Sequence, residues 1–174
     1  MNQLKLFTIL MMLFLFLLAC DGSHSTSKKH LSVQYTEEAM LAKLAIIRSY
    51  HRRAIIDLKL GKRKQALKQL NEIIKIKFPL HFRAGQEAII DAWSRKTMLL
   101  LKWKRYKEAL NTINEAISSI QLKVPSFYVA NLYHVKGRVL EGLKQPRQAL
   151  RSYQHSIELN KKVIQYARKR MKGL

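Results

Sequence analysis

The side chains that most often carry out catalysis are sparse and are not arranged in working pairs. The six histidines stand at positions 24, 30, 51, 81, 134 and 155, with no i,i+4 pair and no cysteine beside them as a shared ligand. A helical zinc site requires such a pair. Gly61-Lys62 lacks the upstream glycine and the following serine or threonine of a phosphate-binding loop. The 11 acidic residues are dispersed, which argues against a hydrolytic carboxylate pair. We therefore expect no enzyme activity, no metal, no cofactor and no small-molecule substrate.

The one cysteine, Cys20, directly follows an uncharged apolar run over residues 6–19. The run has 14 residues and as a helix would span about 21 Å. A bilayer core requires roughly 20 apolar residues, so the run is short for a permanent membrane span. A basic start at Lys5, a short apolar core and the small Ala19 before a cut site are typical of a secretory signal peptide. With one cysteine, no intramolecular disulfide is possible.

The tetrapeptide Leu-Leu-Ala-Cys over residues 17–20 resembles the bacterial lipobox. The resemblance implies a covalent diacylglycerol on Cys20, which cleavage would make the new amino terminus. We accordingly predict a lipoprotein signal peptide over 1–19, a lipidated cysteine with a flexible tether over 20–34, and a folded domain over 35–174. Asp21 resembles the enteric signal for retention in the inner membrane, but the choice between inner and outer membrane stays open. An uncleaved signal anchor and an ordinary cysteine are the alternatives.

The net charge of the whole chain is +22, from 33 basic and 11 acidic residues. So large a positive charge usually suggests a nucleic-acid partner, but export to the cell envelope argues against that partner. Anionic phospholipid headgroups are a more available partner, and one lipidated cysteine plus a basic body would make a two-part membrane anchor. A proteome that is basic throughout would explain the charge equally well.

Three segments repeat one pattern, a turn followed by a helix start and an Ala-Leu pair. The pairs are Ala66-Leu67, Ala109-Leu110 and Ala149-Leu150, at intervals of 43 and 40 residues. These segments resemble the tetratricopeptide repeat, a helix–turn–helix unit of about 34 residues. The resemblance implies packing roles for the following large and small residues: Tyr50, Ala54, Ala66, Trp93, Ala109, Ala116, Tyr133, Gly137, Ala149 and Tyr153. One departure is shared by all units, because Arg53, Lys96 and Lys136 replace the family's leucine.

The fold class predicted is all-α, a helical-hairpin solenoid of about three TPR-like repeats with a lengthened C-terminal capping helix. Six helices are expected near 37–60 (with Thr36 as N-cap), 62–77, 83–103, 105–121, 126–143 and 146–170. Because the intervals exceed the family norm, we expect the first helices of units two and three to be longer by a turn or two. A general array of helical hairpins, with little true repeat geometry, is the alternative.

In such arrays the first helices of the hairpins line a concave surface. The resemblance places the following residues there: Arg48, His51, Ile55, Leu58 and Lys59; Asp91, Ser94, Met98, Leu101 and Lys102; and Asn131, His134, Arg138 and Glu141. Apolar residues interleaved with basic ones suit a peptide or helix with hydrophobic and acidic side chains. A core role for Leu58, Met98 and Leu101 is the alternative.

These features predict a membrane-tethered scaffold of the bacterial cell envelope, which binds an envelope protein or peptide segment and aids assembly of a complex. Small tetratricopeptide lipoproteins of similar build include pilotins for pilus secretins and a component of outer-membrane protein assembly. The alternative is a basic surface protein that binds polyanions such as lipopolysaccharide, teichoic acid or a glycan. A purely structural spacer is a third possibility.

Overall fold

A computed structural model describes the backbone of residues 24–173 and the side chains of residues 37–173. The predicted signal peptide, Cys20 and Asp21 lie outside the described residues. The chain divides into two compact units, Met1–Ala42 and Lys43–Leu174. The second unit contains the whole repeat array apart from the first part of its first helix.

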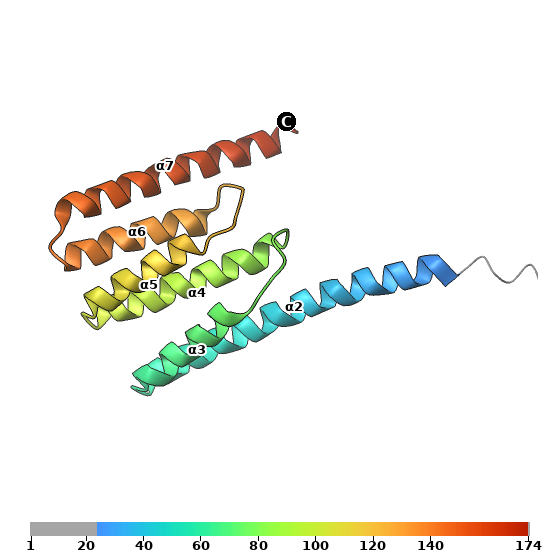
Figure 1. The fold of residues 1–174 in the computed structure, drawn as a ribbon, viewed down its shortest axis with the longest axis horizontal. Coiled ribbons are helices and arrows are strands. Elements are labelled where there is room, and N and C mark those ends of the chain that lie inside the picture. Colours follow the sequence, from blue (N-terminus) through green and yellow to red (C-terminus); the bar gives the residue numbers. More distant parts are fainter. Residues whose placement is uncertain (1–23, 174) are drawn as a thin grey trace, which may run out of the picture. The chain divides into compact units, whose positions relative to one another are not determined.

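The described residues are helical, with short connections and no strand. Figure 1 shows the helices of the second unit as successive antiparallel pairs. The elements are α2 (His24–Lys59), α3 (Arg63–Lys75), α4 (Arg83–Lys102), α5 (Tyr106–Ser118), α6 (Phe127–Gly142) and α7 (Pro146–Met171). This order confirms the predicted all-α solenoid of three hairpins, α2–α3, α4–α5 and α6–α7.

The start of the first helix differs from the prediction. α2 begins at His24, so the expected N-cap at Thr36 lies inside the helix and residues 24–34 of the expected tether are helical. No proline interrupts residues 24–59, and the last glycine before that range is Gly22. The polar composition that suggested a flexible coil therefore carries no residue that stops a helix.

The extra residues between repeats are divided between a helix and two connections. α4 has 20 residues, whereas α3 and α5 have 13 each. Residues 76–82 and 119–126 are not α-helical and join the hairpins. The expected lengthening thus applies to α4, but α6 has only 16 residues, and the remaining residues are in the connections.

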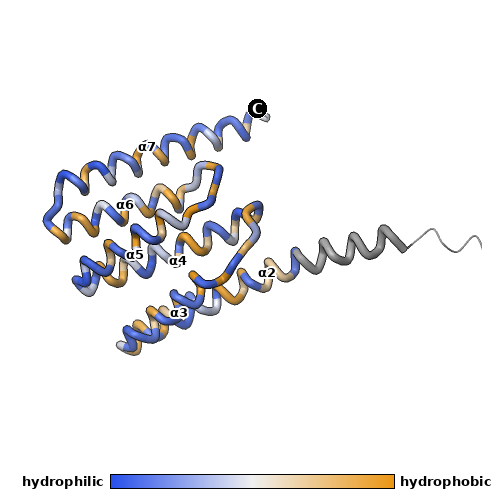
Figure 2. Tube along the Cα trace, viewed as in Figure 1, coloured by the Kyte–Doolittle hydropathy of each residue, from blue (hydrophilic) through white to orange (hydrophobic). Residues whose placement is uncertain are grey.

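Each hairpin packs on the next through the apolar faces of its helices. The largest cluster joins α4, α5 and α6 and includes Trp93, Ile113 and Leu132. A second cluster joins α2, α3 and α4 around Leu70 and Ile73. Figure 2 shows apolar residues recurring along these helices between hydrophilic ones. Burial of these faces, at about 25 cal/mol per Å², is what favours stacking of the hairpins.

Small residues allow the two helices of the last hairpin to approach closely. A Cβ added at Gly137 of α6 would lie 2.5 Å from the ring of Tyr153 on α7. Ala149 of α7 is buried. The aromatic ring of Tyr153 thus occupies the space that the glycine leaves, as the repeat pattern predicts.

The connection before α6 is held by polar contacts. Ser126 is the N-cap of α6, and its hydroxyl accepts a hydrogen bond from the Tyr128 backbone N–H. The same hydroxyl donates to the Glu87 carboxylate on α4 at 2.8 Å, and Arg83 Nε donates to that carboxylate at 2.8 Å. The loop between the second and third hairpins is therefore attached to α4.

None of the helices in the described part of the chain combines the length and apolar character that crossing a bilayer requires.

Candidate binding groove

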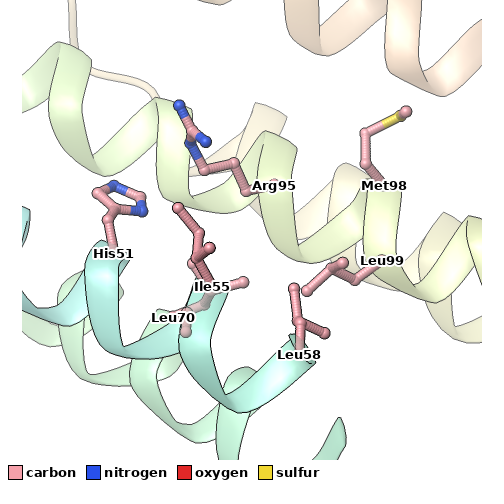
Figure 3. Close-up of a pocket in the computed structure, with 8 residues that line it drawn as sticks. His51, Ile55, Leu58, Leu70, Arg95, Met98 and Leu99 are labelled. Carbon is pink, nitrogen blue, oxygen red and sulfur yellow. The ribbon is translucent and has the colours of Figure 1, made fainter. Parts of the chain in front are cut away.

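Two hollows lie side by side along the seam between α2 and α4. The first has a volume of about 190 Å³, and its lining is mainly apolar. Figure 3 shows His51, Ile55 and Leu58 of α2 opposite Arg95 and Leu99 of α4, while the Met98 side chain, which also lines the hollow, points away from α2. The two first helices therefore form the walls of this hollow, and Leu70 of α3 contributes to its lining.

The second hollow, of about 300 Å³, continues the seam from His51 toward the connection before α6. Arg48 and His51 line it from α2, and Glu87 and Asp91 line it from α4. Tyr128 of α6 also borders it. His51 is common to both hollows, so we treat them as one groove, the α2–α4 groove.

A charged cluster stands where the two hollows meet. The Arg95 Nε donates to Asp91 Oδ2 at 2.5 Å, and His51 Nε2 lies 3.9 Å from the same oxygen. Burial lowers the pKa of His51 below its usual 6.5, and Arg95 lowers it further, while Asp91 partly offsets both. The imidazole is thus favoured in its neutral form, and Arg95 is the positive group beside the apolar hollow.

Part of the predicted groove set lies in these two hollows. Of the predicted residues, six line the two hollows: Arg48, His51, Ile55, Leu58, Asp91 and Met98. Lys102 is exposed and borders a further hollow near Trp103, and Lys59 is exposed at the end of α2. Arg95 and Leu99 line the groove but were missed. The i,i+4 spacing of Asp91 and Arg95 is a signal for that ion pair and would have placed Arg95 on this face.

Two predicted groove residues of α4 have other roles. Ser94 is 4% exposed, and it accepts a 3.4 Å hydrogen bond from the Asn131 side-chain amide of α6. Leu101 packs against the buried cluster of Leu100, Ala109 and Val139. Their assignment to an open concave surface was wrong, because α4 turns that part of its circumference toward α5 and α6.

The predicted residues of α6 are not gathered in the α2–α4 groove. Arg138 Nη1 lies 3.3 Å from the sulfur of Met98 across the α4–α6 seam. Glu141 accepts a hydrogen bond from the Tyr153 hydroxyl at 2.9 Å, and the His134 ring lies 5.4 Å from that of Tyr153. Burial and the Glu141 carboxylate raise the pKa of Tyr153 to about 12. His134 and Glu141 therefore lie beside α7.

The predicted packing residues lie between helices. Tyr50 is half-buried beside the α2–α3 cluster, and the Tyr133 ring lies 4.2 Å from that of His155. The buried members of the set are Ala54, Ala66, Trp93, Ala109, Ala116, Gly137 and Ala149.

The shared departure from the repeat pattern has a physical explanation in two units. The Arg53 guanidinium lies 6.0 Å from the centre of the Tyr50 ring, and the Lys96 ammonium lies 5.3 Å from that of Trp93. A cation over an aromatic face contributes about 0.5–1 kcal/mol at an exposed site. The basic residue thus covers the repeat's own aromatic side chain, three residues earlier on the same helix.

The described residues include no group of three or more His, Cys, Asp or Glu side chains placed to hold a metal ion.

Comparison with known proteins gives a tetratricopeptide repeat over residues 130–163. No curated protein and no solved structure matches the chain. The matched residues cover most of α6 and the first two-thirds of α7, which is the third unit of the array. Repeats of this kind mediate protein–protein interactions. The chain is thus an all-α helical-repeat protein with a tetratricopeptide repeat in its last hairpin, an architecture suited to an interaction scaffold.

Proposed function

We propose that this protein is a lipid-anchored scaffold of the bacterial cell envelope that binds a segment of another envelope protein in its α2–α4 groove. The segment presents a large apolar side chain next to an acidic one. The observation that carries this proposal is the hollow of about 190 Å³ with Arg95 and His51 at its rim.

The size and lining of the hollow favour one side chain of a peptide. The apolar hollow by itself, at about 190 Å³, is smaller than the roughly 300–1,000 Å³ that is typical of small-molecule sites. Ile55, Leu58 and Met98 supply apolar walls, and burial of one large aliphatic side chain is worth about 1.5–3 kcal/mol. An anchor of this kind, repeated along an extended or helical segment, is the usual basis of groove recognition.

The charges at the rim favour an acidic neighbour for the apolar anchor. Arg95 is 54% exposed at its side chain although it is bonded to Asp91, so its remaining N–H groups are free to meet a carboxylate. Arg48 lies further along the same groove. A carboxylate that contacts either arginine gains a charge-assisted hydrogen bond.

Membrane attachment rests on the sequence. The charged start, the short apolar run and the Leu-Leu-Ala-Cys ending support export and lipidation of Cys20. The test is metabolic labelling with palmitate, followed by membrane fractionation of the wild type and of Cys20→Ala. We expect label and membrane association for the wild type, and loss of both in Cys20→Ala. A labelled Cys20→Ala protein would contradict lipidation at this site.

The groove is tested by exchange of residues that line it. Ile55→Asp places a charge in the hollow, and Arg95→Gln removes the rim cation; Ile46→Asp and Arg52→Gln are matched controls on exposed parts of α2. Proteins crosslinked to the full chain in intact cells are purified and identified, and binding of the recovered segment is then measured with purified components. Binding should fall about tenfold in Ile55→Asp and persist in the controls. Equal binding by all four variants would sink the groove assignment.

A second candidate function, polyanion binding, is favoured by a basic hollow between α3, α4 and α5. It has a volume of about 440 Å³, and four lysines border it together with Glu72 and Glu115. The lysines are Lys64, Lys68, Lys75 and Lys96. Polyanion binding there would weaken steeply as salt rises, whereas binding through the apolar anchor in the α2–α4 groove would persist.

A further inference from the structure

α7 exposes four large apolar side chains at regular intervals of seven residues. They are Leu150, Ile157, Ile164 and Met171, with 68%, 50%, 51% and 79% of their surface exposed. Residues seven apart lie on the same face of a helix. We call this set the α7 stripe.

The first two members of the stripe occupy repeat positions that are covered elsewhere in the array. Leu67 and Leu110 follow the repeat alanine directly, as Leu150 does, and both pack against the Leu100–Ala109–Val139 cluster. Ile74 and Ile117 stand seven residues later, as Ile157 does. Both pack against the cluster around Trp93 and Leu132.

The helices that cover those positions belong to the following hairpin. α4 covers the face of α3 that carries Ile74, and α6 covers the face of α5 that carries Ile117. On α7 the corresponding side chains, Leu150 and Ile157, are exposed. The stripe is therefore the same stacking face left open, and Ile164 and Met171 extend it beyond the length of α3 and α5.

The flanks of the stripe indicate the charge of what covers it. Within α7, seven Lys and Arg residues stand against one acidic residue, Glu158. Arg147, Lys161 and Arg168 are exposed and lie three or four residues from stripe members, so they border it on the helix surface. An occupant with carboxylates beside its apolar residues would pair with this row.

We propose that the α7 stripe is a second docking surface, which binds an amphipathic helix with acidic flanks from another protein. The helix stacks on α7 as α4 stacks on α3. This surface is separate from the α2–α4 groove, and the proposal stands or falls independently of the function proposed for that groove.

Charge and shape both distinguish this occupant from the alternatives. A second copy has the same net charge of +22, so two copies would repel each other at this surface. Its own open face on α2 carries Ile46 and Ile56 beside Arg52 and Arg53, so arginines would meet Arg147 and Lys161. A lipid surface favours a broad apolar face on the helix, whereas the stripe carries one large exposed apolar side chain every seven residues, which is narrow enough to be covered by a single helix.

The test uses the full chain in nanodiscs of zwitterionic lipid and a synthetic helix as the probe. The probe is a labelled three-heptad peptide with leucine at the first and fourth positions of each heptad and glutamate at the fifth and seventh. Repulsion between the glutamates opposes self-association of the peptide. The control peptide has lysine in place of each glutamate. Fluorescence anisotropy should show binding of the glutamate peptide and at least tenfold weaker binding of the lysine peptide.

Variants of the protein locate the binding. Ile157→Asp/Ile164→Asp should weaken binding of the glutamate peptide about tenfold or more, whereas Leu80→Asp, in an exposed loop, should leave it unchanged. Lys161→Glu/Arg168→Glu should weaken it more than Lys107→Glu/Lys123→Glu, which has the same change in net charge. Because these side chains are exposed, circular dichroism should show an intact fold in all four.

Three results would overturn the proposal. Equal weakening by the two charge-reversed doubles would mean nonspecific attraction to a basic protein. Self-association in sedimentation that is lost in Ile157→Asp/Ile164→Asp would mean that a second copy covers the stripe. Protection of α7 from hydrogen exchange that requires anionic lipid, with no protection by the peptide, would mean that the stripe binds the membrane.

Discussion

The α2–α4 and α4–α6 seams are built from the same repeat positions, yet one is hollow and the other is bridged. At the first seam, His51, Ile55 and Leu58 line an open apolar hollow opposite Arg95. At the second, Asn131 bonds to the buried Ser94, and Arg138 contacts Met98. Leu132 and Val135 of α6 are buried against α4 and α5.

The difference shows that repeat position alone does not decide which side chains face a partner. α4 takes part in both seams, so its circumference is shared between a core contact with α6 and a wall of the groove. α2 has no preceding hairpin in residues 43–173, and Ile46 and Ile56 remain exposed on it. We therefore expect substitutions at the bridged seam to affect stability and those at the hollow seam to affect binding.

The largest effect on stability is expected at the bridged seam. Leu132 is fully buried in the cluster with Trp93 and Ile113. Leu132→Ala should lower the free energy of unfolding by about 2–5 kcal/mol, because it removes buried apolar surface and leaves a cavity. Ile55→Ala, in the hollow seam and 38% exposed, should cost no more than about 0.5 kcal/mol. Urea unfolding measures both, and equal costs would contradict the comparison.

The close packing of α7 against α6 helps to hold α6, which forms one side of the bridged seam. Gly137→Ala should destabilise by about 1–3 kcal/mol, because the added methyl overlaps the Tyr153 ring. In a double-mutant cycle the cost should largely disappear when Tyr153 is alanine, since the overlap is then absent. Additive costs would show that the glycine acts on the helix backbone alone.

A substitution in the loop that leads into α6 should have a smaller effect on stability. Ser126→Ala removes the N-cap contact to Tyr128 and the hydrogen bond to Glu87, and should cost about 1 kcal/mol. Ser126→Thr keeps the hydroxyl and serves as the matched control in thermal unfolding. A loss as large in Ser126→Thr would mean that the size of the side chain matters more than its hydrogen bonds.

The smallest expected effect is a pH dependence of the free energy of unfolding, which arises from His51 at the hollow seam. Burial and Arg95 lower the pKa of His51 below 6.5, so the unfolded chain takes up a proton that the folded chain resists. Stability contributed by neutral His51 is therefore lost as pH falls from about 6.5 toward the lower folded-state pKa. His51→Gln should flatten this part of the profile, whereas His81→Gln, in an exposed loop, should not. Urea unfolding at pH 7.5 and pH 5.5 provides the comparison.

Much of the fold followed from residue patterns, because the repeat alanines and their flanking turns recur along the chain. The ends of α3 to α7 lie within three residues of the expected positions. The start of α2 was wrong by 13 residues, since nothing in residues 24–36 stops a helix. Ser94 and Leu101 were misplaced because the rotation of α4 between its two neighbours depends on packing in three dimensions.

The central claim is that the hollow seam is the surface that meets a partner, and position-resolved crosslinking tests it most directly. A photoreactive amino acid is introduced at position 55 in the groove, or at position 46 on the exposed side of α2, in the full chain in living cells. We predict one discrete crosslinked envelope protein from position 55 and none from position 46. Its crosslinked segment should contain an apolar residue next to an acidic one. The same product from both positions, or none from position 55, would contradict the account.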